Sequence, residues 1–493
     1  MSAELDLNEL VTNPRLPSGA LLVGDRWDAT TSAGRRDHVN PATGEPLASF
    51  ALAGPAEIDR AVSAAVAAFP TWRDTPPGRR RDALLELARL IDAADVELAV
   101  LRSLETGAPF KRKRGASLAG EWVRYYAGWA DKIEGATIPT SAGPALDYTL
   151  LEPYGVVAVL TPWNGGIVSA AMKVVPALAA GNCVVLKPAE LAPFGPLRFG
   201  ELCLQAGVPP GVVNVVPGGA DAGAALVADA RVGKISFTGG GATARRIFEA
   251  ASRNLTPVVM ELGGKSANLV FADADLDAAA MIAVHAGIGP ISGQGCVLPT
   301  RLLVEDAVYD EVEARVVALT RALVVGKPFE DGVQMGPVID EANCARILDV
   351  IDHARTEHAG RLLTGGERLG GALARGYFVA PTVFGDVDNA SDLAQHEVFG
   401  PVLSLVRFQN EDEAVELANG TAYGLGGIVF TNDLHRAHRV AAHLEAGYVG
   451  VNGFPPMPPG APFGGVKQSG FGREGGRAGL DEFLRPKNVY VQL

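Results

Sequence analysis

Residues 156–188, VVAVLTPWNGGIVSAAMKVVPALAAGNCVVLKP, decide the fold class. Two short β-branched runs, VVAVL at 156–160 and CVVLK at 183–187, enclose an Ala-rich segment that is long enough to cross back over a sheet as a helix. Buried apolar strands that alternate with helices are typical of a parallel, doubly wound α/β sheet. The stretch therefore predicts parallel strands that are joined by a helix.

The same alternation continues along the chain. Further strands of the first sheet are expected at 212–216, 234–238 and 257–262. A second alternation predicts strands at 267–271, 301–305, 402–408, 426–430 and 447–452. Upstream, apolar residues at helical spacing predict helices over 54–72, 79–107 and 121–133. We therefore expect an α/β protein with two α/β domains.

The segment TIPTSAGPALDYTLLEPYG at 137–155 interrupts the first domain. It is polar, punctuated by Pro and Gly, and strand-like at its end. Two interpretations stay open: a surface loop, or an arm that pairs with another subunit together with the C-terminal KNVYVQL. The second interpretation favours a homodimer or a homotetramer.

Composition excludes several classes of protein. Hydrophobic residues make up 48% and charged residues 20%, which is ordinary for a globular chain. The net charge of −13 argues against nucleic acid and anionic membranes as partners, because both reward clustered Lys and Arg. The short basic run Lys111–Arg114 is interpreted as a solvated helix end.

The cysteines and the N-terminus indicate a reducing compartment. The spacing of the four cysteines fits neither a metal site nor a disulfide framework; they are Cys183, Cys203, Cys296 and Cys344. We therefore expect free thiols and no bound metal. The acidic N-terminus does not resemble a signal peptide. The apolar stretch 167–186 is interrupted by polar residues and Pro, which makes it a poor membrane span. A cytoplasmic protein is therefore expected.

A Gly-rich turn, FTGGGATARRIF at 237–248, follows a predicted strand and opens a helix. Gly239, Gly241 and Ala244 fit a loose G-x-G-x-x-A pattern, in which backbone N–H groups approach a pyrophosphate. Glu261 follows at about the 20-residue spacing at which that fingerprint places an acid for the ribose. The residues around Glu261, MELGGKS, favour a role other than binding the ribose.

Seven stretches in order carry a more specific signal: TPWNGG (161–166), LKPAE (186–190), FTGG (237–240), ELGGKS (261–266), GQGC (293–296), EVFGP (397–401) and PFGGVKQSGFGRE (462–474). Together they strongly resemble the aldehyde dehydrogenase superfamily, from about residue 20 to the C-terminus. The resemblance implies three parts. They are a Rossmann-like cofactor domain over 1–132 and 152–262, a catalytic α/β domain over 263–468, and a small β oligomerisation arm over 133–151 and 480–493.

The resemblance implies the chemistry of the site. Cys296 matches the family's nucleophile, which attacks a small-molecule aldehyde to form a thiohemiacetal and then a thioester. Asn164 matches the donor that stabilises the oxyanion, and Glu261 matches the general base for thioester hydrolysis. Glu474 matches a carboxylate that relays protons in some members; a surface acid is its alternative interpretation.

The resemblance also implies a nicotinamide cofactor. Its contacts are expected at Thr161, Pro162, Trp163, Lys187, Glu190, Gly218, Thr238, Gly239, Gly240, Leu262, Gly263, Glu397 and Phe399. Lys187 and Glu190 would hold the ribose, and a carboxylate there accepts from ribose hydroxyls and repels a 2′-phosphate. NAD is therefore favoured over NADP. Gly240 stands where the family commonly has Ser, so one hydroxyl contact is lost.

The implied substrate pocket departs from the family pattern. It comprises Gly165, Ser169, Met172, Gly295, Val297, Phe454 and Met457. Gly165 and Gly166 replace an aromatic residue and a proline, and Gly295 is often bulkier elsewhere. An enlarged pocket would suit a bulky apolar or aromatic aldehyde; alternatively, backbone shifts or Met172 refill the space.

Two alternative activities would require a different set of residues. A CoA-acylating relative would typically lack the base that Glu261 provides, so hydrolysis to the free acid is favoured. A cofactor-free cysteine hydrolase would need a histidine paired with the thiol, and none of the eight histidines lies in a recognised motif.

Overall fold

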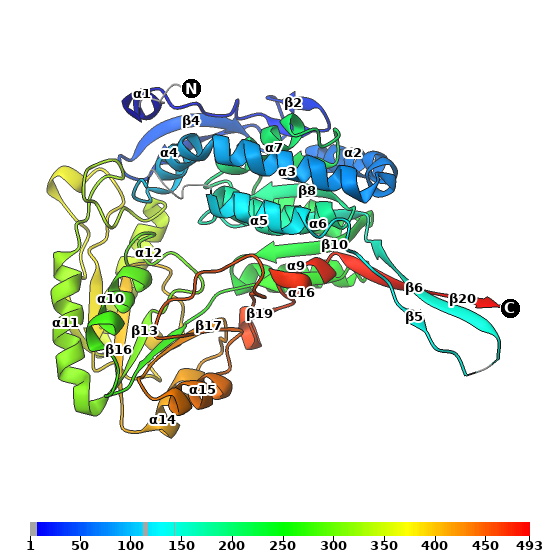
Figure 1. The fold of residues 1–493 in the computed structure, drawn as a ribbon. Helices are drawn as coiled ribbons and strands as arrows, with labels where there is room; N and C mark the ends of the chain where they lie inside the picture. The colour runs from blue at the N-terminus through cyan, green and yellow to red at the C-terminus, as the bar shows by residue number, and fades with distance from the viewer. Residues whose placement is uncertain (1–6, 112–116, 142) are drawn as a thin grey trace.

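The structure is a computed structural model that describes residues 7–111, 117–141 and 143–493. Two α/β bodies lie side by side, and a β arm projects from one of them and carries the C-terminus (Figure 1). This arrangement confirms the predicted α/β class. Most of the basic run that begins at Lys111 lies outside the described residues, as does the acidic start of the chain.

The first sheet contains every strand predicted for it. Its strand order is β19-β11-β10-β7-β8-β9-β1-β2. The parallel strands are β7 (Val156–Thr161), β8 (Cys183–Pro188), β9 (Val213–Val215), β10 (Val232–Thr238) and β11 (Val258–Glu261). The antiparallel edges are β1 (Leu21–Val23), β2 (Arg26–Asp28) and β19 (Gly470–Phe471). Strand β19 lies outside the catalytic range and the arm range expected from the sequence, and it joins the sheet of the first domain.

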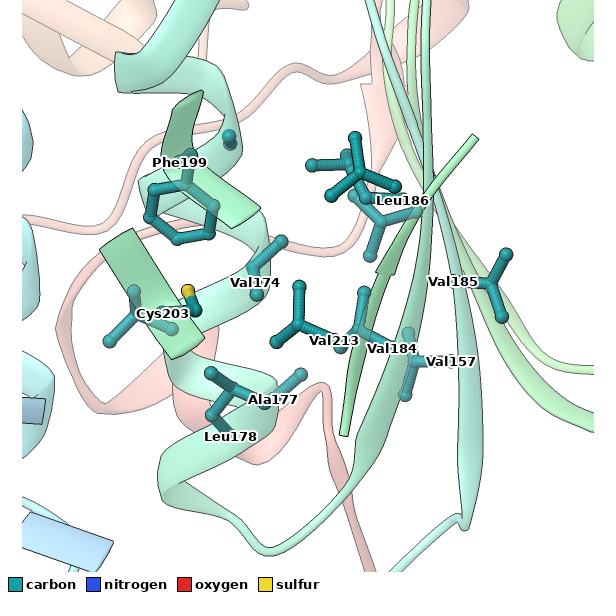
Figure 2. Close-up of a cluster of buried hydrophobic side chains, with 14 of the residues drawn as sticks. Val157, Val174, Ala177, Leu178, Val184, Val185, Leu186, Phe199, Cys203 and Val213 are labelled. Carbon is teal, nitrogen blue, oxygen red and sulfur yellow. The ribbon is translucent and has the colours of Figure 1, made fainter. Parts of the chain in front are cut away.

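Helices cover both faces of this sheet. They are α2 (Pro55–Asp74), α3 (Pro77–Ala93), α5 (Ser117–Ala127), α6 (Gly166–Ala179), α7 (Phe194–Gln205), α8 (Ala220–Ala228) and α9 (Gly241–Ser252). On one face, Val174 of α6 and Phe199 of α7 pack toward Val184 and Leu186 of β8, whereas Val185 points to the opposite face (Figure 2). Burial on both faces explains why these strands are continuously apolar.

Two helix predictions need correction. The helix expected over 79–107 is divided into α3 and α4 (Asp95–Thr106), because Ala94 leaves the helical region at φ −96°, ψ 8°. The amphipathic pattern runs through this break and hides it. The helix expected over 121–133 is α5, which ends at Ala127, before Gly128.

The second sheet has the order β14-β15-β16-β13-β12-β17-β18 and is parallel except at β14. Its predicted strands are β12 (Ala267–Val270), β13 (Arg301–Glu305), β16 (Val402–Phe408), β17 (Gly426–Phe430) and β18 (Tyr448–Val451). The sequence analysis missed β14 (Arg361–Thr364) and β15 (Thr382–Gly385). The main helices are α10 (Leu276–Gly287), α11 (Tyr309–Ala322), α12 (Glu341–Thr356), α14 (Glu411–Asn419) and α15 (Leu434–His443).

The arm is a three-stranded antiparallel sheet. It contains β5 (Thr137–Ile138), β6 (Ala145–Pro153) and β20 (Leu484–Gln492) in the order β20-β6-β5. Within one chain, the 137–155 segment pairs with the C-terminal strand through β6 and β20. No helix in the described ranges is both long and apolar enough to cross a bilayer.

The remaining elements are short or lie at the periphery. They are α1 (Leu7–Thr12), the hairpin β3 (Arg35–Asn40) and β4 (Glu45–Ala51), α13 (Asp392–Gln395), α16 (Gly476–Asp481), and the 3-10 helices Asp306–Val308, Gly371–Leu373 and Lys467–Ser469.

Candidate active site

Four predicted site residues lie at the carboxyl ends of neighbouring strands in the first sheet. Thr161 ends β7, Lys187 lies near the end of β8, Thr238 ends β10 and Glu261 ends β11. The register pairs Thr238 with Glu261, so these ends share one edge. Parallel sheets bind ligands at this edge. The buried hydroxyl of Thr161 has no hydrogen-bond partner among the described residues, as expected for a group that serves a ligand.

Charged side chains gather beyond the end of β8. Lys187 Nζ donates to the carbonyl oxygen of Gly218 at 2.5 Å, and burial lowers the pKa of this lysine although the Glu190 charge raises it. Glu190 Oε1 lies 3.7 Å from Nη1 of Arg36 in β3. Arg36 was not predicted from the sequence, because it is remote in the chain and belongs to none of the motifs.

The Gly-rich turn between β10 and α9 forms an open cradle. Gly240 is the N-cap of α9, and a Cβ built on it would meet nothing within 4 Å. Gly239 is different: its N–H donates to the carbonyl oxygen of Glu261 at 3.0 Å, and the ring of Phe237 leaves no room for a side chain. The first N–H groups of a helix lack intrahelical acceptors and suit a phosphate. The cradle, the Thr161 hydroxyl and the charges near Lys187 thus fit a dinucleotide.

Residues from the second body complete the proposed cofactor site. Phe399 has φ of +50°, which is unusual without glycine, and its ring meets Trp163 edge to face at 5.7 Å between centroids. Glu397 Oε1 accepts from the N–H of Gly264 at 3.2 Å, and burial raises its pKa to about 7. A Cβ on Gly263 would overlap the Glu397 carboxylate. A strained backbone, such as the positive φ of Phe399, is typical of functional sites.

Several contacts fix the loop of Cys296, between α10 and β13. Gly293 has φ of +68° and packs directly on the backbone of Gly400, so its glycine is required. The side chain of Gln294 donates a hydrogen bond to a main-chain carbonyl oxygen and accepts one from a main-chain N–H. Asn164 Nδ2 donates to the carbonyl oxygen of Gln294 at 2.8 Å. The structure therefore brings Asn164 and the Cys296 loop together, and the bare sequence around Cys296 forms an ordered loop.

Cys296 differs from the other thiols in its exposure. It is partly exposed, whereas Cys183, Cys203 and Cys344 are buried, and all are free. Burial of the sulfur away from water raises the pKa of the Cys296 thiol to about 12, and the negative charges of Glu397 and two other glutamates add to this rise. Burial thus holds the sulfur in its protonated form, which must lose its proton when it attacks.

Glu261 is one of those glutamates. It is 2% exposed, and neither carboxylate oxygen has a hydrogen-bond partner among the described residues. Burial and then the charge of Glu474 raise its pKa well above the usual range, although Lys173 and Arg473 oppose this. A Cβ on Gly464 would lie 2.7 Å from its Oε1, so the chain passes close to the carboxyl group. A buried, unpartnered acid with a raised pKa is typical of a catalytic group.

The chain around Glu261 is fastened to the C-terminal segment. Glu261 pairs with Gly470 where β19 joins β11. The N–H of Leu262 donates to the carbonyl oxygen of Ser469 at 3.0 Å. The hydroxyl of Ser469 donates to the carbonyl oxygen of Gly263 at 2.7 Å. Glu261 thus sits on a strand that is held on both sides.

Glu474 is buried, so the interpretation as a surface acid is wrong. Its side chain is 8% exposed and forms an ion pair with Lys173, which is 1% exposed. Lys173 Nζ also lies 3.1 Å from the hydroxyl oxygen of Ser236. Sequence reasoning missed Lys173 as a site residue, although a single charge inside the apolar helix α6 was a usable signal.

The small residues of the predicted pocket do not create empty space at two positions. A Cβ on Gly165 would overlap the hydroxyl of Ser169. A Cβ on Gly295 would lie 2.8 Å from Ile291 Cδ1 and 2.9 Å from Leu298 Cγ. At these two positions the pocket is therefore not enlarged. The space is filled, as in the second alternative, but by neighbours other than Met172.

The other predicted pocket residues lie on both bodies. Met172 is buried in the core of the first body, and Phe454 packs against that of the second. Val297 contacts the start of β17 at Gly426, and Met457 is partly buried in the segment after β18. Pro162 lies between Thr161 and Trp163 in the loop before α6.

Comparisons with known proteins agree with this geometry. The sequence model of the aldehyde dehydrogenase family matches residues 27–489. An aldehyde dehydrogenase of Enchytraeus buchholzi is 44% identical over 461 residues, covering 92% of each chain. Retinal dehydrogenase 2 of Homo sapiens is 41% identical over 480 residues, covering 96% of this chain and 92% of the relative.

A solved structure extends the agreement to three dimensions. The crystal structure of a betaine aldehyde dehydrogenase from Staphylococcus aureus in complex with NAD⁺ superimposes with a TM-score of 0.95. It is 33% identical, and the match covers 100% of this chain and 98% of that one. The chain described here belongs to the aldehyde dehydrogenase family.

Proposed function

We propose that this protein oxidises an aldehyde to the carboxylic acid with NAD, through a covalent adduct on Cys296. One observation carries the proposal. The loop of Cys296 is hydrogen-bonded to Asn164, and the charge of the buried Glu261 acts on the same thiol. The Glu261 carboxylate has no hydrogen-bond partner within the part of the chain that the structure describes. A nucleophile, an amide donor and a base thus meet where the two bodies face each other.

Residues of both bodies would hold the cofactor. The cradle at Gly240 suits the pyrophosphate, Lys187 and Glu190 the ribose, and Glu397 with Phe399 the nicotinamide end. NAD supplies the two-electron oxidant when it is bound. The solved relative in complex with NAD⁺ supports this choice.

The side chains around Cys296 perform the acyl chemistry. The sulfur bonds to the carbonyl carbon, the carbonyl π bond breaks, and the thiol proton ends on the carbonyl oxygen, which makes a thiohemiacetal. The Asn164 amide donates to the oxygen that becomes negative; removing one such donor typically costs about 3 kcal/mol of barrier. In the ground state this amide donates to Gln294, so its second N–H is the one left for the substrate.

Glu261 carries the hydrolytic half of the reaction. After oxidation the acyl group is a thioester on Cys296, and Glu261 takes a proton from the water that attacks it. The ion pair of Glu474 with Lys173 gives that proton a neighbouring acceptor in an otherwise buried region.

For the substrate, we infer an uncharged apolar aldehyde of aromatic or larger size. Because neighbours fill the space at Gly165 and Gly295, the likeness to retinal dehydrogenase 2 supports this size, and the two glycines do not. The side chains expected at the pocket are apolar or carry one hydroxyl, and the relative named retinal dehydrogenase 2 supports an apolar substrate. A quaternary ammonium aldehyde fits less well, because Phe454 is the one aromatic residue in the predicted set, and such cations favour aromatic cages. A higher kcat/KM for acetaldehyde than for benzaldehyde would contradict this inference.

We further propose that the protein is a homodimer or homotetramer assembled through its arm. Leu146 and Leu150 of β6 and Tyr490 and Val491 of β20 are exposed, and another copy would cover them. Light scattering that gives a monomer mass would contradict this.

The activity is tested with a panel of aldehydes and NAD, without CoA or phosphate, by following NADH and the free acid. The wild type and a Cys344→Ala control should produce both, and Cys296→Ala should produce neither. NADH formation that requires CoA would favour the CoA-acylating alternative. Acid release from an ester without NADH would favour the cofactor-free hydrolase.

A further inference from the structure

The end of β8 holds a charge that NAD alone does not need. Arg36 comes from β3, in the N-terminal hairpin, and its Nη1 lies 3.7 Å from Glu190 Oε1. Glu190 is the carboxylate that would repel a 2′-phosphate on the ribose. With Lys187, Glu190 and Arg36 together, the ribose end of the site has more positive than negative charge.

We infer that Arg36 binds the 2′-phosphate of NADP, so that this protein accepts NADP in addition to NAD. The inference rests on the proposed cofactor site and adds a specificity-determining residue to it. A guanidinium is planar and donates two parallel hydrogen bonds to a phosphate. An arginine near the ribose is the usual means by which a doubly wound sheet accommodates the extra phosphate.

The geometry leaves Arg36 able to make that contact. The distance of 3.7 Å to Glu190 is longer than the 2.7–2.9 Å of a tight charged hydrogen bond. The Arg36 side chain is 46% exposed, and loose pairs of this kind contribute little stability, so the guanidinium can turn from Glu190 to a phosphate at small cost. While paired, it also offsets the charge that would otherwise repel the phosphate.

The floor of the site has room for the ligand. A Cβ on Gly219 would meet only Glu190 Oε1, at 3.9 Å. Lys187 lies on the same side, because its Nζ bonds to Gly218 and its charge interacts with Glu190. The phosphate would therefore meet two cations supplied by separate parts of the chain.

The preceding residue provides a matched control. Arg35 has the same charge, but its donors are used elsewhere: Nε bonds to the Ser49 hydroxyl at 3.1 Å, Nη2 to the Ser49 carbonyl at 2.8 Å and Nη1 to the Ala29 carbonyl at 3.0 Å. Arg35→Ala thus removes one positive charge from the same strand without removing the proposed phosphate contact.

The test begins with binding of 2′,5′-ADP and 5′-AMP by isothermal titration calorimetry, which requires no catalysis. For Arg36→Ala, the affinity for 2′,5′-ADP relative to 5′-AMP should fall at least about tenfold. For Arg35→Ala, this ratio should stay within about twofold of the wild type. Equal ratios in both variants would overturn the inference, as would a wild type that shows no binding of 2′,5′-ADP.

The second readout is kcat/KM for NADP relative to NAD with one good aldehyde. The wild type should use NADP within about a hundredfold of NAD, and Arg36→Ala should lower the ratio at least about tenfold. A wild type with no NADP turnover would overturn the inference even if NAD is used. If no aldehyde is oxidised with either cofactor, the proposed function fails, and the calorimetric ratio still decides the role of Arg36.

Discussion

Lys173 is the buried cation of the candidate active site, and replacing it by Met tests the electrostatics there. Its side chain is 1% exposed and pairs with Glu474, which is 8% exposed. Met has a similar volume, so the change removes charge with little cavity. Removing one partner of a buried ion pair typically costs about 3–5 kcal/mol, because the other charge stays buried without compensation.

The assay is thermal unfolding at neutral pH with two comparison variants. Lys132→Met removes an exposed lysine that pairs with Asp131, and such pairs are worth at most about 1 kcal/mol. With an unfolding entropy of about 1 kcal/mol/K for 493 residues, Lys173→Met should lower Tm by about 2–5 °C more than Lys132→Met. Adding Glu474→Gln to Lys173→Met should recover part of the loss, since an amide carries no charge. Equal Tm values for Lys173→Met and Lys132→Met would refute the reasoning.

The same substitution has a kinetic consequence. The Lys173 charge lowers the pKa of Glu261, and Glu474 raises it. In Lys173→Met the pKa of Glu261 therefore rises further, and the rise of kcat with pH, which reports the hydrolytic step, should move to higher pH. In the double variant with Glu474→Gln the two effects oppose each other, so the profile should return toward that of the wild type.

Three further predictions address the nucleophile's surroundings. Asn164→Ala should lower kcat about 100- to 1000-fold with little change in KM in steady-state kinetics; a loss below about threefold would remove Asn164 from oxyanion binding. Because the pKa of Glu261 is raised well above the usual range and a base acts only when ionised, kcat should rise with pH beyond the range in which an ordinary glutamate ionises; a flat profile of kcat in a pH series would contradict this. Gly293→Ala should inactivate the enzyme and lower Tm, since φ is +68° and the facing backbone blocks a Cβ, whereas Gly332→Ala, at φ +75° in open space, should retain activity; similar activity in the two variants would contradict this.

Periodicity predicted the strands well, because both sheets bury their central strands on both faces. The runs at 156–160 and 183–187 became β7 and β8 almost residue for residue. The helix break at Ala94 was hidden, because the amphipathic pattern continues across it. The edge strand β19 is two residues long, which leaves no period to detect.

The candidate site was predictable where one segment carries the signal. Cys296, Glu261 and Asn164 belong to motifs with glycines at turns or strand ends. Lys173 and Arg36 were missed because their roles depend on contacts with distant segments. The size of the substrate pocket could not be predicted from the sequence either, because a glycine leaves empty space only if no neighbouring side chain fills it. Ser169 fills the space at Gly165, while Ile291 and Leu298 fill it at Gly295.

The most direct test of the central claim uses Glu261→Gln, which keeps the shape of the side chain and removes the base. Mixed with NAD and a good aldehyde, this variant should release one equivalent of NADH rapidly and then stop. Intact mass and peptide mapping should find one acyl group per chain, on Cys296. Sustained wild-type turnover, no burst of NADH, or an acyl group on any other residue would contradict the account.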